Sequence, residues 1–279
     1  MQSKPNWPLL AAWRFVLATI VVVFHLQVMY RSTFRGSQFI TNLGADHAVL
    51  CFLLLSGFSI AHSIKERPQG FIIRRMWRIY PVYLACFLLS LLPFAVWGPL
   101  QKTPGGFTLE PPSSFQAVVH LFIGQPLLSR SFRIFNPSWT LGVEWAFYML
   151  APLFLRAPRK AMQWIISISA IWFMIKVVRV GLPEATGPTP YLSLLWVWLL
   201  GFYIVRFDQK NAAFVLICVP LLIIPLYARA AQGAFLWTAT VSLVFIGDKI
   251  LLPTILSKLG QKLGDLSYSL YLIHVSAFT

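Results

Sequence analysis

Acidic residues are scarce in this sequence, and charged residues of either sign are few. Asp and Glu number 8 against 23 Lys and Arg, and only 11% of the 279 residues are charged. Soluble domains carry about a quarter charged residues, so this composition excludes an ordinary soluble domain. Hydrophobic residues make up 58% of the chain. The composition predicts an all-α polytopic membrane protein, with residues 1–279 forming one integral-membrane domain.

Cysteine is also scarce, and the chain lacks an internal repeat. Cys51, Cys86 and Cys218 all lie inside apolar runs, which excludes a disulfide framework and indicates no metal site. The sequence therefore does not show the inverted repeats that are typical of many transporters. A cleavable signal peptide is not expected, because the first apolar run is too long and no small-residue cleavage site follows it.

The net charge of +15 does not predict nucleic-acid binding. The basic residues form no tract with interleaved aromatic side chains. They cluster between apolar runs instead, as they do in the cytoplasmic loops of membrane proteins. We expect no nucleic-acid partner, and a multi-pass membrane protein whose amino terminus is cytoplasmic.

Apolar runs separated by basic or Pro/Gly-rich loops predict about nine transmembrane helices, since about 20 apolar residues cross the hydrocarbon core. The expected helices cover residues 9–30, 46–62, 79–97, 139–155, 161–180, 191–205, 212–228, 234–247 and 266–279. A further segment, residues 249–265, carries Lys258 and Lys262 and is expected to be an interfacial helix.

The apolar run 115–128 is too short for an ordinary span and contains Gly124 and Pro126. We expect it to form one re-entrant or interfacial segment. If it does not cross the membrane, the next helix returns to the starting side. Arg156 and Arg159 then lie with the other basic residues, as the positive-inside rule favours.

The first apolar run carries two ionisable side chains, Arg14 and His25. Such residues are costly inside a bilayer and by default indicate function. They are 11 residues apart, which at about 100° per residue returns to within roughly 20° of the same helix face, about 16 Å along the axis. This stripe predicts a cation at one boundary and an imidazole near the midplane. A packing role for His25 and snorkelling of Arg14 to lipid headgroups are the alternatives.

Two carboxylates are further candidates. Glu144 lies inside the expected helix 139–155, where a carboxyl is costly unless it is paired or protonated. It is predicted to bind a substrate hydroxyl or relay a proton, or else to pair with an arginine of a neighbouring helix. Asp46 stands next to His47 at the start of the expected helix 46–62. It is predicted to orient a histidine or to act as the N-cap.

A basic pair opens the third expected helix. Arg75 and Arg78 stand at positions i and i+3, which places them on one helix face. The guanidinium fork matches phosphate oxygens. The pair is predicted to bind a phosphorylated ligand, or else to set topology beside lipid phosphates.

Five short blocks, spread from Arg14 to His274, carry a family pattern. They are Arg14 with His25; His47-Ala48-Val49 followed by FLLLSGF at 52–58; Arg75-x-x-Arg78-Ile79-x-Pro81-x-Tyr83; Trp139-Thr140-Leu141-x-x-Glu144-x-x-Phe147-Tyr148 with Pro152; and Ser267-Tyr268-Ser269-Leu270-Tyr271-Leu272-Ile273-His274. Together they resemble the membrane acyltransferase family 3, bacterial inner-membrane proteins that acylate carbohydrates.

The resemblance implies an acyl-CoA-dependent membrane O-acyltransferase. Such proteins take an acyl group, usually acetyl, from acyl-coenzyme A at the cytoplasmic side. They place it on a sugar hydroxyl of an exopolysaccharide, lipopolysaccharide or lipid-linked glycan. The family's first-helix pair falls on Arg14 and His25, its basic pair on Arg75 and Arg78, and its fourth-block acid on Glu144. We expect acetyl-CoA as the donor substrate, no metal, a glycan acceptor and surrounding membrane lipid.

The predicted site follows from these placements. Arg14, Arg75 and Arg78 would hold the polyanionic coenzyme A at the inner rim, while the thin pantetheine arm brings the thioester to His25. His25 is predicted to be the general base on the sugar hydroxyl, with transient acyl carriage as its second role. Asp46 and Glu144 complete the predicted catalytic set.

Two other functions and one doubt about length stay open. A transporter or flippase for a glycan precursor is one alternative, and an inactive shortened family member is the other. The family usually adds one helix after the fifth block, whereas this chain ends five residues after His274. That leaves open a domain truncated at its carboxyl terminus.

Overall fold

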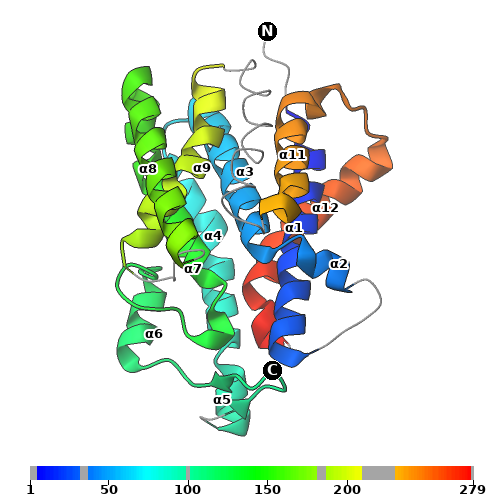
Figure 1. Ribbon diagram of the computed structural model, residues 1–279, viewed down its shortest axis with the longest axis vertical. Coiled ribbons are helices and arrows are strands. Elements are labelled where there is room, and N and C mark those ends of the chain that lie inside the picture. The colour runs from blue at the N-terminus through cyan, green and yellow to red at the C-terminus, as the bar shows by residue number, and fades with distance from the viewer. Residues whose placement is uncertain (1–4, 32–36, 99–100, 181–186, 209–229, 278–279) are drawn as a thin grey trace.

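The computed structural model describes residues 5–31, 37–98, 101–180, 187–208 and 230–277. Within these ranges the chain is almost wholly helical (Figure 1). In chain order its elements are α1 (Trp7–Tyr30), α2 (Ser37–Asn42), α3 (Ala45–Glu66), α4 (Phe71–Leu89), α5 (Leu92–Trp97), β1 (Gln101–Lys102), β2 (Thr108–Leu109), α6 (Ser114–Leu121), η1 (Arg133–Phe135), α7 (Ser138–Arg156), α8 (Arg159–Val180), α9 (Thr189–Arg206), α11 (Ala230–Ile246), η2 (Gly247–Lys249) and α12 (Thr254–Ala277).

The predicted all-helical membrane fold is supported by the apolarity of its helices. Four helical stretches of the described chain are long and apolar enough to cross a membrane: Trp7–Tyr30, Ala45–Glu66, Phe71–Trp97 and Thr189–Arg206. The expected count of about nine spans is therefore not confirmed. The expected helix at 212–228 lies outside the described residues.

The start of α1 is fixed by a polar side chain. Asn6 accepts a hydrogen bond from the backbone N–H of Leu9 at 3.2 Å, as an N-cap does. Its amide also donates to the carbonyl oxygens of Gly247 and Ile250, at 3.3 and 2.9 Å. One side chain thus ties the beginning of α1 to η2, which follows α11, and to the residue after it.

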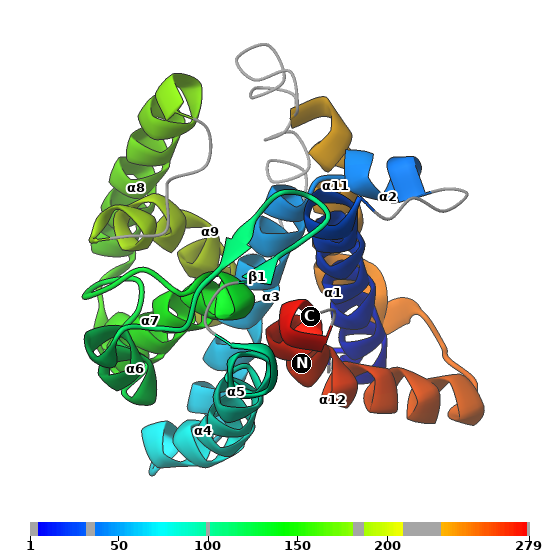
Figure 2. The same ribbon diagram turned by 90° about the horizontal axis from the view of Figure 1, so that it is seen from below.

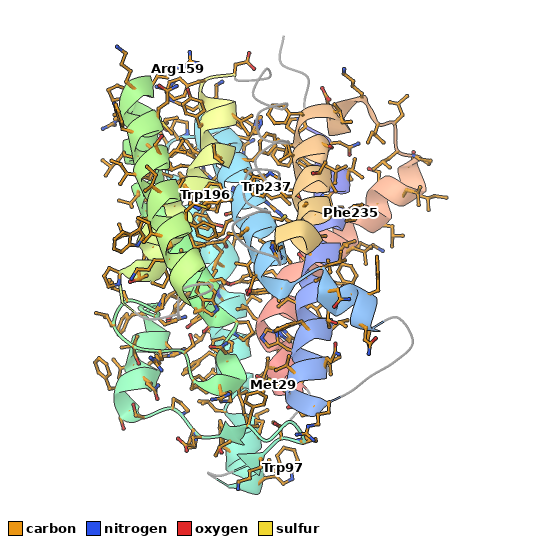
Figure 3. The ribbon with its side chains drawn as sticks, in the orientation of Figure 1. Met29, Trp97, Arg159, Trp196, Phe235 and Trp237 are labelled. Atoms are coloured by element: carbon orange, nitrogen blue, oxygen red, sulfur yellow. The ribbon has the colours of Figure 1, made fainter. Side chains whose placement is uncertain are left out.

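From α1 to α9 the long helices run along the longest axis of the molecule and alternate in direction (Figure 1). The turn from α7 to α8 carries Arg159 and lies at the same end as the start of α1 (Figures 1 and 3). This is the arrangement expected if residues 115–128 do not cross the membrane. Which side of a membrane this end faces stays a prediction.

The run 115–128 forms no spanning helix, as predicted. Its helix α6 has 8 residues and begins with a capping box between Ser113 and Gln116. The chain then turns, and the carbonyl of Gln125 approaches α7 so closely that a Cβ at Gly142 would overlap its oxygen. Glycine is required at position 142 because only a residue without a side chain admits this contact.

The expected boundary between an interfacial helix ending at 265 and a span beginning at 266 is wrong. α12 is one continuous helix, Thr254–Ala277. Its first half lies across the bundle and its second half along it (Figure 2). The first half packs closely on α1, where a Cβ at Gly260 would stand 2.6 Å from the carbonyl oxygen of Pro8. Close approach through small residues is typical of helix pairs in membranes.

The expected start of the third helix at residue 79 is also wrong. α4 begins at Phe71, so the basic residues that directly precede position 79 occupy its first two turns. The change matters for the site, because a helix fixes the directions of Arg74, Arg75 and Arg78 relative to one another.

α3 and α9 approach each other through reciprocal glycines. A Cβ at Gly57 of α3 would overlap the carbonyl oxygen of Trp198, and a Cβ at Gly201 of α9 would overlap that of Leu54. Around this contact α9 buries large side chains, including Trp198 and Phe202, which are both fully buried. α9 therefore packs tightly on one face of α3, while another face of α3 lines the cavity.

We predict that Gly201→Ala destabilises the protein, because the added methyl group has no space between α9 and α3. Overpacking in a close-packed interior costs about 1–3 kcal/mol, which should lower the midpoint of thermal unfolding in detergent. Gly247→Ala is the matched control, since its Cβ would meet only Leu9 Cδ2 at 3.6 Å. An unchanged midpoint for Gly201→Ala would contradict the packing described here.

Candidate functional site

A cavity of about 340 Å³ lies between α1, α3, α4, α7 and α12. Its charged lining residues are Arg14, Arg75, Arg78, Glu144 and Asp265. Serine, threonine and tyrosine side chains from α3, α7 and α12 supply hydroxyl groups, and Val49, Phe52 and Ile79 supply apolar wall. Four of the six predicted site residues are thus brought together by five helices.

Arg14 reaches from α1 to α3. Its guanidinium donates to the carbonyl oxygen of Leu55 at 3.1 Å and to the hydroxyl of Ser59. Ser59 in turn donates to the same carbonyl at 2.8 Å. The guanidinium therefore faces the cavity, inside the protein, rather than snorkelling toward lipid headgroups.

Glu144 and Tyr148 stand one turn apart on α7. The Tyr148 hydroxyl donates to Glu144 Oε2 at 3.3 Å. Since its hydrogen is used there, it accepts from Ser56 Oγ, 2.9 Å away on α3. Arg14 and Arg75 interact electrostatically with Glu144. The carboxyl is thus both partner to arginines of neighbouring helices and part of the cavity wall.

The adjacent residues Arg74 and Arg75 of α4 contact different parts of the protein. Arg75 is half-buried and lines the cavity, with its guanidinium 5.8 Å from the centre of the Phe71 ring. Arg78 lies one turn further on and is exposed at the cavity. Arg74 instead donates to the carbonyl oxygens of Arg67 and Gln69, where the chain enters α4. The i, i+3 pair named from the sequence is therefore the pair that meets the cavity.

His25 does not line the cavity; it pairs with another histidine. Its Nδ1 lies 3.2 Å from Nε2 of His274 on α12 and 2.9 Å from the carbonyl oxygen of Val21. The link to the cavity is Tyr271, whose hydroxyl is 3.0 Å from Thr140 Oγ1. The ring of Tyr271 is 6.3 Å, between centroids, from that of His274. Tyr271 thus lines the cavity and also contacts His274, whereas the path from Arg14 to His25 stays a prediction.

Asp46 lies in the first turn of α3, with an exposed side chain, and is not among the residues that line the cavity. The N-cap of α3 is Gly44, with φ of +81°, so the N-cap interpretation of Asp46 is wrong. A carboxylate in the first turn is favourable because of the helix dipole. The neighbouring ring of His47 lies against Gly233 of α11. The orienting role of Asp46 stays a prediction.

Sequence reasoning undervalued His274 and did not single out Tyr148 or Tyr271. Tyr148 could have been found from its i+4 spacing to Glu144, since such residues share a helix face. His274 had no comparable signal, because its partner His25 lies 249 residues away in the chain. Only the packing of α12 on α1 brings the two rings together.

A comparison with known families assigns the chain. A family model described as an acyltransferase domain matches residues 9–279. The chain belongs to acyltransferase family 3. The family assignment agrees with the five sequence blocks, each of which contributes residues to the cavity. It supports an acyltransferase enzyme with apolar, membrane-type helices.

Among curated relatives of this chain is the acyltransferase MdmB of Streptomyces mycarofaciens. The two are 30% identical over 203 residues, which is 68% of this chain and 51% of the relative. The chain thus spans about half the length of the curated relative that it matches. No solved structure matches it.

We predict that Ser56 and Tyr148 act as one unit. Tyr148→Phe removes the hydroxyl between Ser56 and Glu144, which should cost about 0.5–1.5 kcal/mol, measured from unfolding in detergent. A further Ser56→Ala should cost less than the same change in the wild type, because one of the two partners of the serine hydroxyl, Tyr148 and Glu144, is already gone. The two changes are therefore non-additive.

The control pairs Ser56→Ala with Tyr203→Phe. The Tyr203 hydroxyl accepts from Arg159 Nε and Gln163 Nε2, each at 2.9 Å, and contacts neither Ser56 nor Glu144. This pair should be additive. Additive losses for Ser56 and Tyr148 would contradict the proposed connection.

Proposed function

We propose that the protein transfers an acyl group, acetyl in the first instance, from acyl-coenzyme A to a sugar hydroxyl. The acceptor is an exopolysaccharide, a lipopolysaccharide or a lipid-linked glycan. The observation that carries this proposal is the convergence of Arg14, Arg75 and Arg78 on one cavity. Membership of an acyltransferase family supplies the reaction class.

The cavity chemistry fits a phosphorylated donor. Guanidinium groups bind phosphate oxygens through paired, charge-assisted hydrogen bonds. Arg78 is exposed and Arg75 half-buried, which suits a ligand whose phosphates stay near the mouth. The hydroxyl groups and apolar walls further in suit a thin arm carrying amides and a thioester.

His25 would perform the proton transfer. As general base, it takes the proton of the acceptor hydroxyl while the hydroxyl oxygen bonds to the acyl carbon. The carbon–sulfur bond then breaks, and the coenzyme A thiolate leaves with the proton returned by His25. Transient acyl carriage by His25 is the second route, and a base is favoured because it needs no covalent intermediate. In either route the thioester must reach His25 past Tyr271.

The basic end of the bundle would face the cytoplasm. Arg74, Arg75 and Arg78 occupy the start of α4, and Arg159 lies at the end of the molecule that also holds the start of α1. Positive residues are concentrated in cytoplasmic loops of inner-membrane proteins. Acyl-coenzyme A would enter from that side, and the glycan acceptor from the other.

The experiment that tests this proposal measures transfer of labelled acetyl from acetyl-coenzyme A to glycan in membranes that contain the protein. Transfer to glycan supports the proposal. Failure of transfer with well-folded protein would overturn it and leave an inactive family member, whereas glycan translocation without acylation would indicate a transporter. Mass spectrometry of cell-surface glycan, with and without the gene, identifies the acceptor.

We predict that Arg75→Gln raises the KM for acetyl-coenzyme A about 10- to 100-fold, because one charge-assisted hydrogen bond to phosphate is lost. Arg74→Gln is the matched control: it removes the same charge from the adjacent residue, which donates to backbone carbonyls instead. Equal KM values for the two variants would argue against phosphate binding in the cavity.

We predict that His25→Ala abolishes acyl transfer without loss of the folded protein, because it removes the proposed base. His62→Ala is a suitable control, since His62 contacts the rings of Trp7 and Phe58 away from the cavity. Initial rates with labelled acetyl-coenzyme A compare the two. Full activity of His25→Ala would remove His25 from the mechanism.

A further inference from the structure

Two histidines from opposite ends of the chain form a hydrogen-bonded pair inside the bundle. His25 belongs to α1 and His274 to the second half of α12, where it is buried to 1% exposure. His25 is half-buried. Their ring centroids are 5.0 Å apart, and the contacting atoms are Nδ1 of His25 and Nε2 of His274. Each ring also faces backbone carbonyls of its own helix.

The carbonyl contacts fix which nitrogen carries the hydrogen on each ring. A carbonyl oxygen can only accept, so a ring nitrogen bonded to it must be an N–H. Nδ1 of His274 lies 2.9 Å from the Tyr271 carbonyl oxygen and 3.3 Å from that of Leu270. Nδ1 of His25 lies 2.9 Å from the Val21 carbonyl oxygen. Both rings are therefore protonated at Nδ1 when neutral.

This assignment determines the direction of the bond between the rings. With its hydrogen on Nδ1, neutral His274 has a lone pair on Nε2, which accepts from the Nδ1–H of His25. That N–H is shared between His274 and the Val21 carbonyl, at 3.2 and 2.9 Å. Nε2 of His25 is left with its lone pair, as a general base requires.

We infer that His274 is a positioning residue for His25: together with the Val21 carbonyl it holds the ring in the tautomer with a basic Nε2, and it stabilises the imidazolium formed when that atom takes a proton. The inference rests on the proposed acyl transfer. When Nε2 of His25 receives the acceptor proton, the positive charge is shared with Nδ1–H, which donates to His274. The proton then passes from Nε2 to the departing thiolate, and the pair returns to its starting state.

Three replacements of His274 separate positioning from packing. His274→Gln can place its amide oxygen near the position of Nε2 and so keeps an acceptor for His25. His274→Asn is one bond shorter and does not reach that position, and His274→Leu has no acceptor. We expect kcat for acetyl transfer to fall about 10- to 100-fold in the Leu and Asn variants. The Gln variant should recover most of it, with the KM for acetyl-coenzyme A unchanged in all three.

Wild-type kcat in His274→Leu, alongside an inactive His25→Ala, would overturn the inference and leave the proposed function intact. A rise in KM with constant kcat would also overturn it, because that result indicates donor binding rather than control of the base.

A second measurement does not depend on activity. In protein with ¹⁵N-labelled histidine, nuclear magnetic resonance shifts distinguish a protonated from an unprotonated ring nitrogen, and the signals of His25 are identified by their loss in His25→Ala. We expect Nδ1–H and a bare Nε2. A hydrogen on Nε2 would overturn the inference even if wild-type protein transfers acetyl. An inactive wild type with bare Nε2 would refute the proposed function instead, while the pairing of the rings would stand.

Discussion

A guanidinium inside an apolar bundle must give its N–H groups to the protein, and this requirement governs the site. Placing an arginine at the centre of a membrane helix costs roughly 2.5–3.5 kcal/mol even by insertion scales. Arg14 offsets that cost by donating to the Leu55 carbonyl and to Ser59, and by its interaction with Glu144. The hydrogen bonds tie α1 to α3, and the interaction with Glu144 connects Arg14 to α7. The cavity is the space that these polar contacts keep open.

The close packing of helices around the cavity sets its geometry. Gly57 and Gly201 let α3 and α9 approach to backbone contact, and Gly260 does the same for α12 on α1. Because such contacts leave no freedom to slide, α12 delivers both Tyr271 to the cavity wall and His274 to His25. The arginine cavity and the histidine pair are in this way two parts of one arrangement, linked through Tyr271 of α12.

Sequence reasoning succeeded where one helix carries the relevant information. The i, i+3 spacing of Arg75 and Arg78 predicted a shared helix face, and both residues line the cavity. The free-energy cost of a carboxyl in an apolar run indicated Glu144. It failed where a boundary depends on packing. The helix boundary predicted at residue 265 followed from the change in composition there. α12 is nevertheless continuous, and its more polar first half lies across the bundle and packs on α1. Asp46 was chosen by proximity to His47 in the chain, which says little about where its side chain lies.

The sequence by itself determined the helical membrane class, the acyltransferase family and the stripe that joins Arg14 to His25, because these follow from composition, motifs and helix periodicity. Only the tertiary structure decided that His25 faces His274, that Tyr148 bridges Ser56 and Glu144, and that Tyr271 stands between the cavity and the histidines. Apart from the bond between Tyr148 and Glu144, which lies within α7, each of these contacts joins residues from different helices. Their distances depend on how the helices cross, and no local pattern in the chain encodes that.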